Sequence, residues 1–131
     1  MSVDDGRWTI TESGEVRHIT TATELDEALD AIHERATDQH CLATIRSPAG
    51  DELLIGLGGY LSVLQFTHDD NPPYWVTVGD PEAEGITAFV FEGQETEILR
   101  RNLVPPEDAR HAAVVFFESG VMPRSVRWEE V

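Results

Sequence analysis

The side chains best suited to metal binding or nucleophilic chemistry are one cysteine and five histidines: Cys41, His18, His33, His40, His68 and His111. No two histidines have the helical spacing that would place both imidazoles on one face, and no Cys-x-x-Cys pair occurs. His40 and Cys41 are neighbours on an expected strand, which points them to opposite faces. The spacing therefore predicts neither a metal site nor a bound cofactor.

Three other features invite a chemical interpretation, and each has a simpler structural one. His68-Asp69-Asp70 offers oxygen ligands but lacks the spacing of a calcium-binding loop. The thiol of Cys41 lies in an apolar segment, where a buried and unreactive cysteine is the usual case. Gly56-Leu57-Gly58-Gly59 has no following lysine, unlike a phosphate-binding loop. We interpret these glycines as residues that bend the sheet or end a strand.

Carboxylates are the one catalytic group that the sequence has in abundance, and no pair of them is distinctive. A hydrolase that uses two carboxylates therefore stays open as an alternative. No Gly-x-Ser-x-Gly nucleophile elbow occurs. We interpret the chain as a binding protein and not as an enzyme.

Net charge is the strongest signal for a binding function. The 25 acidic residues against nine arginines give −16, and no arginine or lysine occurs between Arg46 and Arg100. Such a field repels nucleic acid and anionic membranes and attracts basic partners. The alternative is an acidic surface that only keeps the protein soluble or adapts it to salt.

The candidate binding surface is the acidic stretch 69–97. Tyr74 and Trp75 lie beside its first carboxylates, and aromatic anchors among carboxylates suit a surface that grips a basic protein. Alternation along a strand places the two rings on opposite faces, so that one can be buried while the other is free. The candidate partner-binding residues are Asp69, Asp70, Tyr74, Trp75, Asp80, Glu82, Glu84 and Glu92.

The elements expected to position these residues form an α+β domain. Alternating polar and apolar residues predict strands at 7–12, 15–20, 41–46, 52–57, 60–67, 74–78, 86–92, 95–98 and 125–130. The first two strands form an N-terminal hairpin around Ser13-Gly14, and the last strand ends the chain. We expect an antiparallel sheet with two helices packed on one face. Trp8 and Trp128, in the terminal strands, are expected in the core.

The two expected helices have clear end signals. The first spans residues 21–36, where Thr21 and Glu24 form a plausible capping box and apolar residues recur at helical spacing. The second begins at Pro105-Pro106, since proline is tolerated in a first turn, and ends at Gly120, a good C-terminal cap.

Residues 1–131 are expected to form one acidic domain. The length suits a single domain with its own core. The lone cysteine suits a reducing compartment, and neither a signal peptide nor an apolar run of about 20 residues is visible. We therefore expect a cytoplasmic protein, and like-charge repulsion favours a monomer when it is free.

Two stretches resemble the type-one family of bacterial polymorphic-toxin immunity proteins, which includes immunity proteins against double-stranded-DNA cytosine deaminases. The first stretch is the helix 21–32 after an N-terminal hairpin. The second is a C-terminal block made of residues 89–93, 104–110, 113–120 and 123–128. In the family, a helix ending in a Thr-Gly-like step precedes a proline and a final tryptophan. Here Ser119-Gly120, Pro123 and Trp128 take these places.

The resemblance implies an α+β fold, no enzymatic activity and tight one-to-one inhibition of a cognate toxin made by the same cell. The matching positions look like fold determinants, so they transfer no functional residues. A toxin that acts on nucleic acid, such as a deaminase, needs a basic cleft, which a −16 protein complements. The alternative function is a generic acidic protein-binding or DNA-mimic module with a basic partner.

Overall fold

The sheet is built from nine strands in residues 7–69 and 71–131, the part of the chain that the computed structural model describes. Two helices and one 3-10 turn accompany it. In chain order the elements are β1 (Trp8–Glu12), β2 (Glu15–Ile19), α1 (Ala22–Arg35), β3 (Cys41–Arg46), β4 (Asp51–Leu57), β5 (Leu64–His68), β6 (Asn71–Thr77), β7 (Ile86–Phe91), β8 (Gln94–Leu99), η1 (Arg100–Asn102), α2 (Pro106–Ser119) and β9 (Trp128–Glu130).

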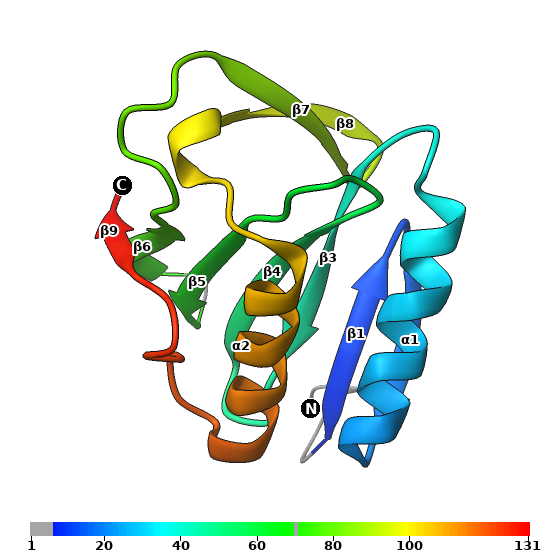
Figure 1. Cartoon of the computed structure of the whole chain (residues 1–131). Helices are drawn as coiled ribbons and strands as arrows, with labels where there is room; N and C mark the ends of the chain where they lie inside the picture. Colours follow the sequence, from blue (N-terminus) through cyan, green and yellow to red (C-terminus); the bar gives the residue numbers. More distant parts are fainter. Residues whose placement is uncertain (1–6, 70) are drawn as a thin grey trace.

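Seven of these strands form one continuous antiparallel sheet in the order β2-β1-β3-β4-β5-β6-β9. The hairpin of β7 and β8 joins this sheet through a single parallel pairing of Val90 with Cys41, at the start of β3. Figure 1 shows the hairpin crossing the top of the view, while both helices lie in front of the main sheet. The predicted α+β architecture is therefore confirmed, with its N-terminal hairpin, helices on one face and final C-terminal strand.

Alternation along the strands creates a buried cluster on each face of the sheet. Ala43 of β3 and Leu53 of β4 face the helices and pack with Leu29 and Phe116 in the larger cluster. Leu42 and its neighbours on the other face pack with Phe89 of the β7–β8 hairpin in the smaller cluster. The hairpin thus covers part of the face that the helices leave open.

The helix ends have the caps that the sequence predicts. Thr21 accepts a hydrogen bond from the backbone N–H of Glu24 at 3.1 Å, and the Glu24 carboxylate accepts one from the N–H of Thr21 at 3.1 Å. Pro106 opens α2, and Gly120 ends it with φ = +75°. No helix in the described residues is both long enough and apolar enough to cross a membrane.

Three strands begin three or four residues away from their predicted starts, and the other strand bounds agree to within one residue. β5 begins at Leu64 and not at residue 60, because Ser62 leaves the sheet to bridge to Val104. β6 begins at Asn71, since Pro72 and Pro73 lie at a register shift where their missing N–H groups interrupt no ladder. β9 has only three residues, which pair with the end of β6.

The terminal tryptophans pack against the larger cluster, as predicted, although each stays partly exposed. The ring of Trp8 meets that of Phe116 edge to face, with centroids 5.0 Å apart. The indole N–H of Trp128 donates to the carbonyl of Pro123 at 2.6 Å. The first and last strands are thereby tied to the core.

The glycine-rich run at the end of β4 has a packing role. A Cβ at Gly56 would lie 2.7 Å from the ring of Phe89. A Cβ at Gly58 would lie 2.2 Å from the carbonyl oxygen of Ala36, and Gly58 has φ = +102°. β4 ends at Leu57, so Gly58-Gly59 ends the strand as expected, whereas Gly56 lies inside it.

We predict that Gly58→Ala strongly destabilises the protein. The left-handed backbone alone costs an alanine roughly 1–2 kcal/mol, and displacing the Ala36 carbonyl adds roughly 1–3 kcal/mol. Gly14→Ala is the matched control, because Gly14 also has a positive φ, at +81°, but nothing within 4 Å of its Cβ position. Urea unfolding of both variants measures the difference, and equal losses of stability would show that the close approach to Ala36 carries no energy.

Candidate partner-binding surface

Tyr74 and Trp75 point to opposite faces of β6, as alternation predicts. Tyr74 is 41% exposed. Trp75 is half-buried and packs against the larger core cluster, on the side of the helices. Of the two predicted aromatic anchors, Tyr74 is therefore the more exposed.

Tyr74 lines a shallow groove of about 190 Å³ on the face of the sheet opposite the helices. Leu54 of β4 and Phe91 of β7 contribute apolar walls, and Glu52 and Thr67 contribute polar atoms. The carboxylate of Glu52 pairs with Arg46 at 3.2 Å. The groove thus combines exposed apolar surface with a carboxylate at its edge, a combination that suits protein recognition.

The predicted acidic residues fall into two groups. Asp69 lies two residues after Thr67 of the groove, and Glu92 directly follows Phe91, so both are near the groove in the chain. Asp80, Glu82 and Glu84 lie on the exposed loop beyond the far end of β6. A seven-residue strand spans about 20 Å, so the structure does not bring these three beside Asp69. Asp70 lies outside the described residues.

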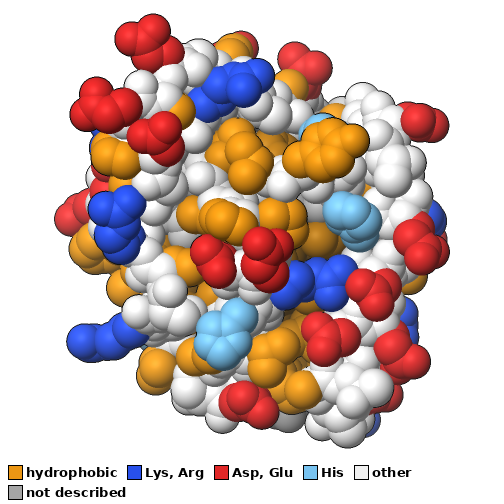
Figure 2. All heavy atoms as spheres, in the orientation of Figure 1, with side chains coloured by type: hydrophobic (Ala, Val, Ile, Leu, Met, Phe, Trp, Pro, Cys, Tyr) orange, Lys and Arg blue, Asp and Glu red, His pale blue; other side chains and the backbone are white. Residues whose placement is uncertain are grey.

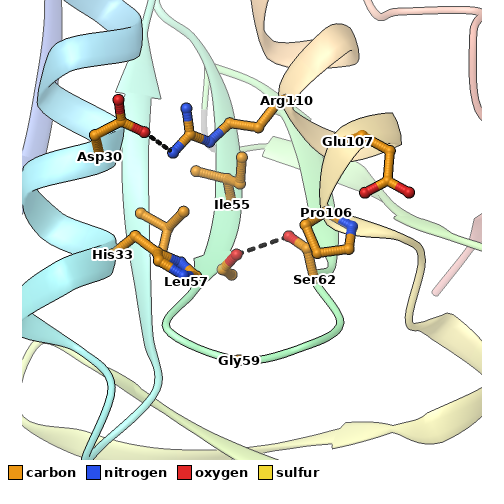
Figure 3. Close-up of a pocket in the computed structure, with 10 residues that line it drawn as sticks. Asp30, His33, Ile55, Leu57, Gly59, Ser62, Pro106, Glu107 and Arg110 are labelled. Atoms are coloured by element: carbon orange, nitrogen blue, oxygen red, sulfur yellow. Dashed lines mark hydrogen bonds and ion pairs between the residues drawn. The ribbon is translucent and has the colours of Figure 1, made fainter.

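A second cavity, of about 300 Å³, lies between α1 and α2 at the end of β4 (Figure 3). On one side, the Asp30 carboxylate pairs with Arg110 at 2.7 Å. On the other side, the carboxylate of Glu107 stands at the first turn of α2. One edge is formed by the loop after β4, where Ser62 donates its hydroxyl to the carbonyl of Gly56 at 2.7 Å.

The polar groups of this interhelical pocket do not form a catalytic arrangement. Nucleophilic catalysis needs a nucleophile hydrogen-bonded to a base. The Ser62 hydroxyl instead donates to a backbone carbonyl, and the Nδ1 atom of His33 accepts the backbone N–H of Gly58 at 2.9 Å. These bonds hold the loop against α1. Within residues 7–69 and 71–131, no three side chains of His, Cys, Asp or Glu are grouped so that they could hold a metal ion.

The loop at the mouth of this pocket carries the most exposed aromatic residue in the described part of the chain. Tyr60 is 98% exposed and the adjacent Leu61 is 45% exposed. The sequence pattern did not indicate either residue, because residues 60–67 alternate like a strand. The signal that could have found them is the Gly58-Gly59 pair, because paired glycines are typical of a turn or loop.

Carboxylates and apolar side chains are interspersed on the face that carries the helices. Figure 2 shows acidic side chains around the rim and at the centre of this face, with hydrophobic side chains exposed between them. Arg35 pairs with Glu12 at 3.3 Å, and Arg110 pairs with Asp26 at 3.6 Å in addition to Asp30. With nine arginines for 25 acidic residues, arginines are too few to pair one to one with the carboxylates.

Comparison with known proteins identifies a family. The family model described as immunity protein Imm1 matches residues 13–130, which is nearly the whole chain. No curated protein matches the chain. The resemblance drawn from the sequence to the type-one immunity family is confirmed.

We predict that Cys41 is chemically inert in the folded protein. Burial raises the pKa of its thiol to about 11, and the nearby carboxylate of Glu12 acts in the same direction. With a pKa of about 11, about one thiol in a thousand is ionised at pH 8. A thiol-reactive disulfide reagent should therefore label the native protein far more slowly than the protein in denaturant. Rapid labelling of the native protein would contradict the assignment of a buried, unreactive thiol.

Proposed function

The chain belongs to the immunity protein Imm1 family, and we propose that it binds and neutralises a cognate toxin that acts on nucleic acid, such as a deaminase. The observation that carries this function is the family match over residues 13–130. Protection against a toxin follows from the family. The class of toxin rests on the charge of the chain.

A toxin that acts on nucleic acid needs a basic cleft for the phosphate backbone. A protein with net charge −16 is complementary to such a cleft. Opposite charges accelerate the encounter of two proteins and disfavour partners of like charge. Rapid capture suits an inhibitor that must bind each toxin molecule before it reaches the nucleic acid.

We place the contact with the toxin at the groove beside Tyr74. The half-exposed ring supplies an aromatic anchor, and Trp75 supports β6 from the other face. Asp69 and Glu92 supply charge near the groove, and Asp70 follows Asp69 in the chain. Asp80, Glu82 and Glu84 extend the acidic field beyond the far end of β6 and act by steering.

Inhibition in this proposal is occlusion, so it requires no catalytic group. The free protein is a monomer that meets its toxin one to one in the cytoplasm of the producing cell. The same acidic surface also favours a second candidate function, an acidic protein-binding or DNA-mimic module with a basic partner other than a toxin. The two differ in whether the protein rescues cells from a toxin.

The first test is co-expression with the C-terminal domain of the large secreted protein encoded next to this chain. We expect that domain to stop growth when expressed alone, and co-expression to restore growth and yield a stoichiometric complex in a pull-down. Growth arrest that co-expression does not relieve would reject the immunity function towards that domain. A complex with a basic protein that is not toxic would favour the second candidate function.

The second test addresses the groove. Tyr74→Ala combined with Asp69→Lys and Asp70→Lys should weaken binding of that toxin domain by about 10- to 100-fold, because an exposed anchor and the steering charge are both lost. Calorimetry measures the affinity, and stopped-flow mixing shows whether association slows. Trp75 is left intact, since its loss would also remove core packing.

The matched control places lysine at two exposed carboxylates elsewhere, Glu15 on β2 and Glu118 near the end of α2. This Glu15→Lys and Glu118→Lys variant changes the net charge by the same amount as the double substitution at 69 and 70. An equal loss of affinity in both charge variants would mean that net charge acts without a defined surface. Unchanged binding in the groove variant would refute the placement at Tyr74.

A further inference from the structure

Tyr60 and Leu61 are adjacent, exposed and apolar, on the loop that joins β4 to β5. The fold gains nothing from the ring of Tyr60, because 98% of the residue's surface faces solvent. Single exposed apolar residues are common on protein surfaces, whereas a contiguous apolar patch rimmed by polar groups marks an interaction site. Here two such residues adjoin a cavity that carries charged walls.

The loop is held firmly at both ends. The N–H of Gly58 donates to Nδ1 of His33 at 2.9 Å. Ser62 and Val104 exchange two backbone hydrogen bonds, each of 2.8 Å, and the Ser62 hydroxyl binds the carbonyl of Gly56. An exposed side chain on a fixed loop loses little conformational freedom on binding, which favours its use as an anchor.

The interhelical pocket lies directly beside this loop, since Gly59 and Ser62 both line it. Its charged groups are the carboxylates of Asp30 and Glu107 and the guanidinium of Arg110. Arg110 is already engaged by Asp30, at 2.7 Å, and by Asp26, at 3.6 Å. Glu107 has no ion-pair partner among the residues that the structure describes. Two carboxylates against one guanidinium leave the pocket with a net negative charge, and Asp26 adds to it from outside the lining.

We propose that the Tyr60–Leu61 loop and the interhelical pocket form a second docking surface for the toxin. The toxin places a lysine or arginine side chain in the pocket, where Glu107 accepts its hydrogen bonds, and it packs apolar atoms on Tyr60 and Leu61. A carboxylate without a cation favours a basic side chain at this position, and the loop that carries Tyr60 borders the pocket at Gly59 and Ser62. This inference rests on the proposed function, because it names a contact of the same partner.

This docking surface is distinct from the Tyr74 groove. The pocket lies between the two helices, whereas the groove lies on the opposite face of the sheet. Substitutions at one surface leave the contacts of the other unchanged. Each surface can therefore be tested without the other.

The test measures binding of the purified full-length chain to the toxin domain encoded next to it. Tyr60→Ala should raise Kd by about 30-fold or more, the range of an interface hot spot, while the melting temperature stays unchanged. Tyr60→Phe should retain most of the affinity. Val121→Ala is the control, because Val121 is also exposed, at 62%, and lies beyond the other end of α2.

The pocket is tested with Glu107→Gln and Glu107→Arg. The amide should raise Kd by about tenfold, the ordinary cost of removing one charged partner, and the arginine should raise it further. If wild type binds the toxin and Tyr60→Ala binds equally well, the docking surface is refuted while the immunity function stands. If Tyr60→Ala weakens binding but both Glu107 variants bind as wild type does, the basic side chain in the pocket is refuted. If wild type itself does not bind, the proposed function and this inference fail together.

Discussion

Because Gly56 and Gly58 have no side chains, the β7–β8 hairpin and the end of α1 can both pack closely against β4. On one face, the ring of Phe89 occupies the space that a Cβ of Gly56 would take. At the end of the strand, the carbonyl of Ala36, the residue that caps α1, approaches the Cβ position of Gly58 even more closely. The β7–β8 hairpin and α1 are thus both positioned by the same short run of β4. The loop that carries Tyr60 and borders the interhelical pocket begins at this run, so its geometry depends on it too.

Charged side chains are almost absent from the core of the described residues. The groups that stabilise the fold are therefore different from the charged groups that could contact a partner. Asp51 is the only acidic residue buried in residues 7–69 and 71–131, and its carboxylate contacts the ring of His68. The other carboxylates of this part of the chain lie at the surface, where exposed ion pairs contribute little to stability. The surface charge can therefore serve a partner without weakening the packing beneath it. Its cost is mutual repulsion among like charges, which salt screens.

Sequence patterns correctly predicted the features that neighbouring residues determine on their own. Thr21 and Glu24 specify the start of α1, Gly120 specifies the end of α2, and alternation specifies which residues of β3 face the helices. The misplaced strand start at residue 60 has a different origin. Residues 60–67 alternate like a strand, but Ser62 pairs with Val104, some forty residues away in the chain, and no local pattern reveals that contact.

The candidate surface was only partly predictable for the same reason. Alternation separated Tyr74 from Trp75 correctly, but the sequence could not show that β6 keeps Asp80, Glu82 and Glu84 away from Asp69. It also could not show that Phe91 returns to the wall of the Tyr74 groove, because β7 reaches the main sheet through one long-range pairing at Cys41.

Charge alone is a poor basis for recognising one toxin. The fields of exposed carboxylates are largely screened beyond about 8 Å at physiological salt, and they attract any basic protein. Such fields set how fast partners meet, whereas the lifetime of a complex depends on closely packed contacts. In the proposed mechanism, Tyr74 and Tyr60 supply those contacts from two fixed positions. The inhibitor then selects a partner that both packs against an aromatic anchor and pairs with a carboxylate. A basic protein of the wrong shape could pair with the carboxylate but could not pack against the ring.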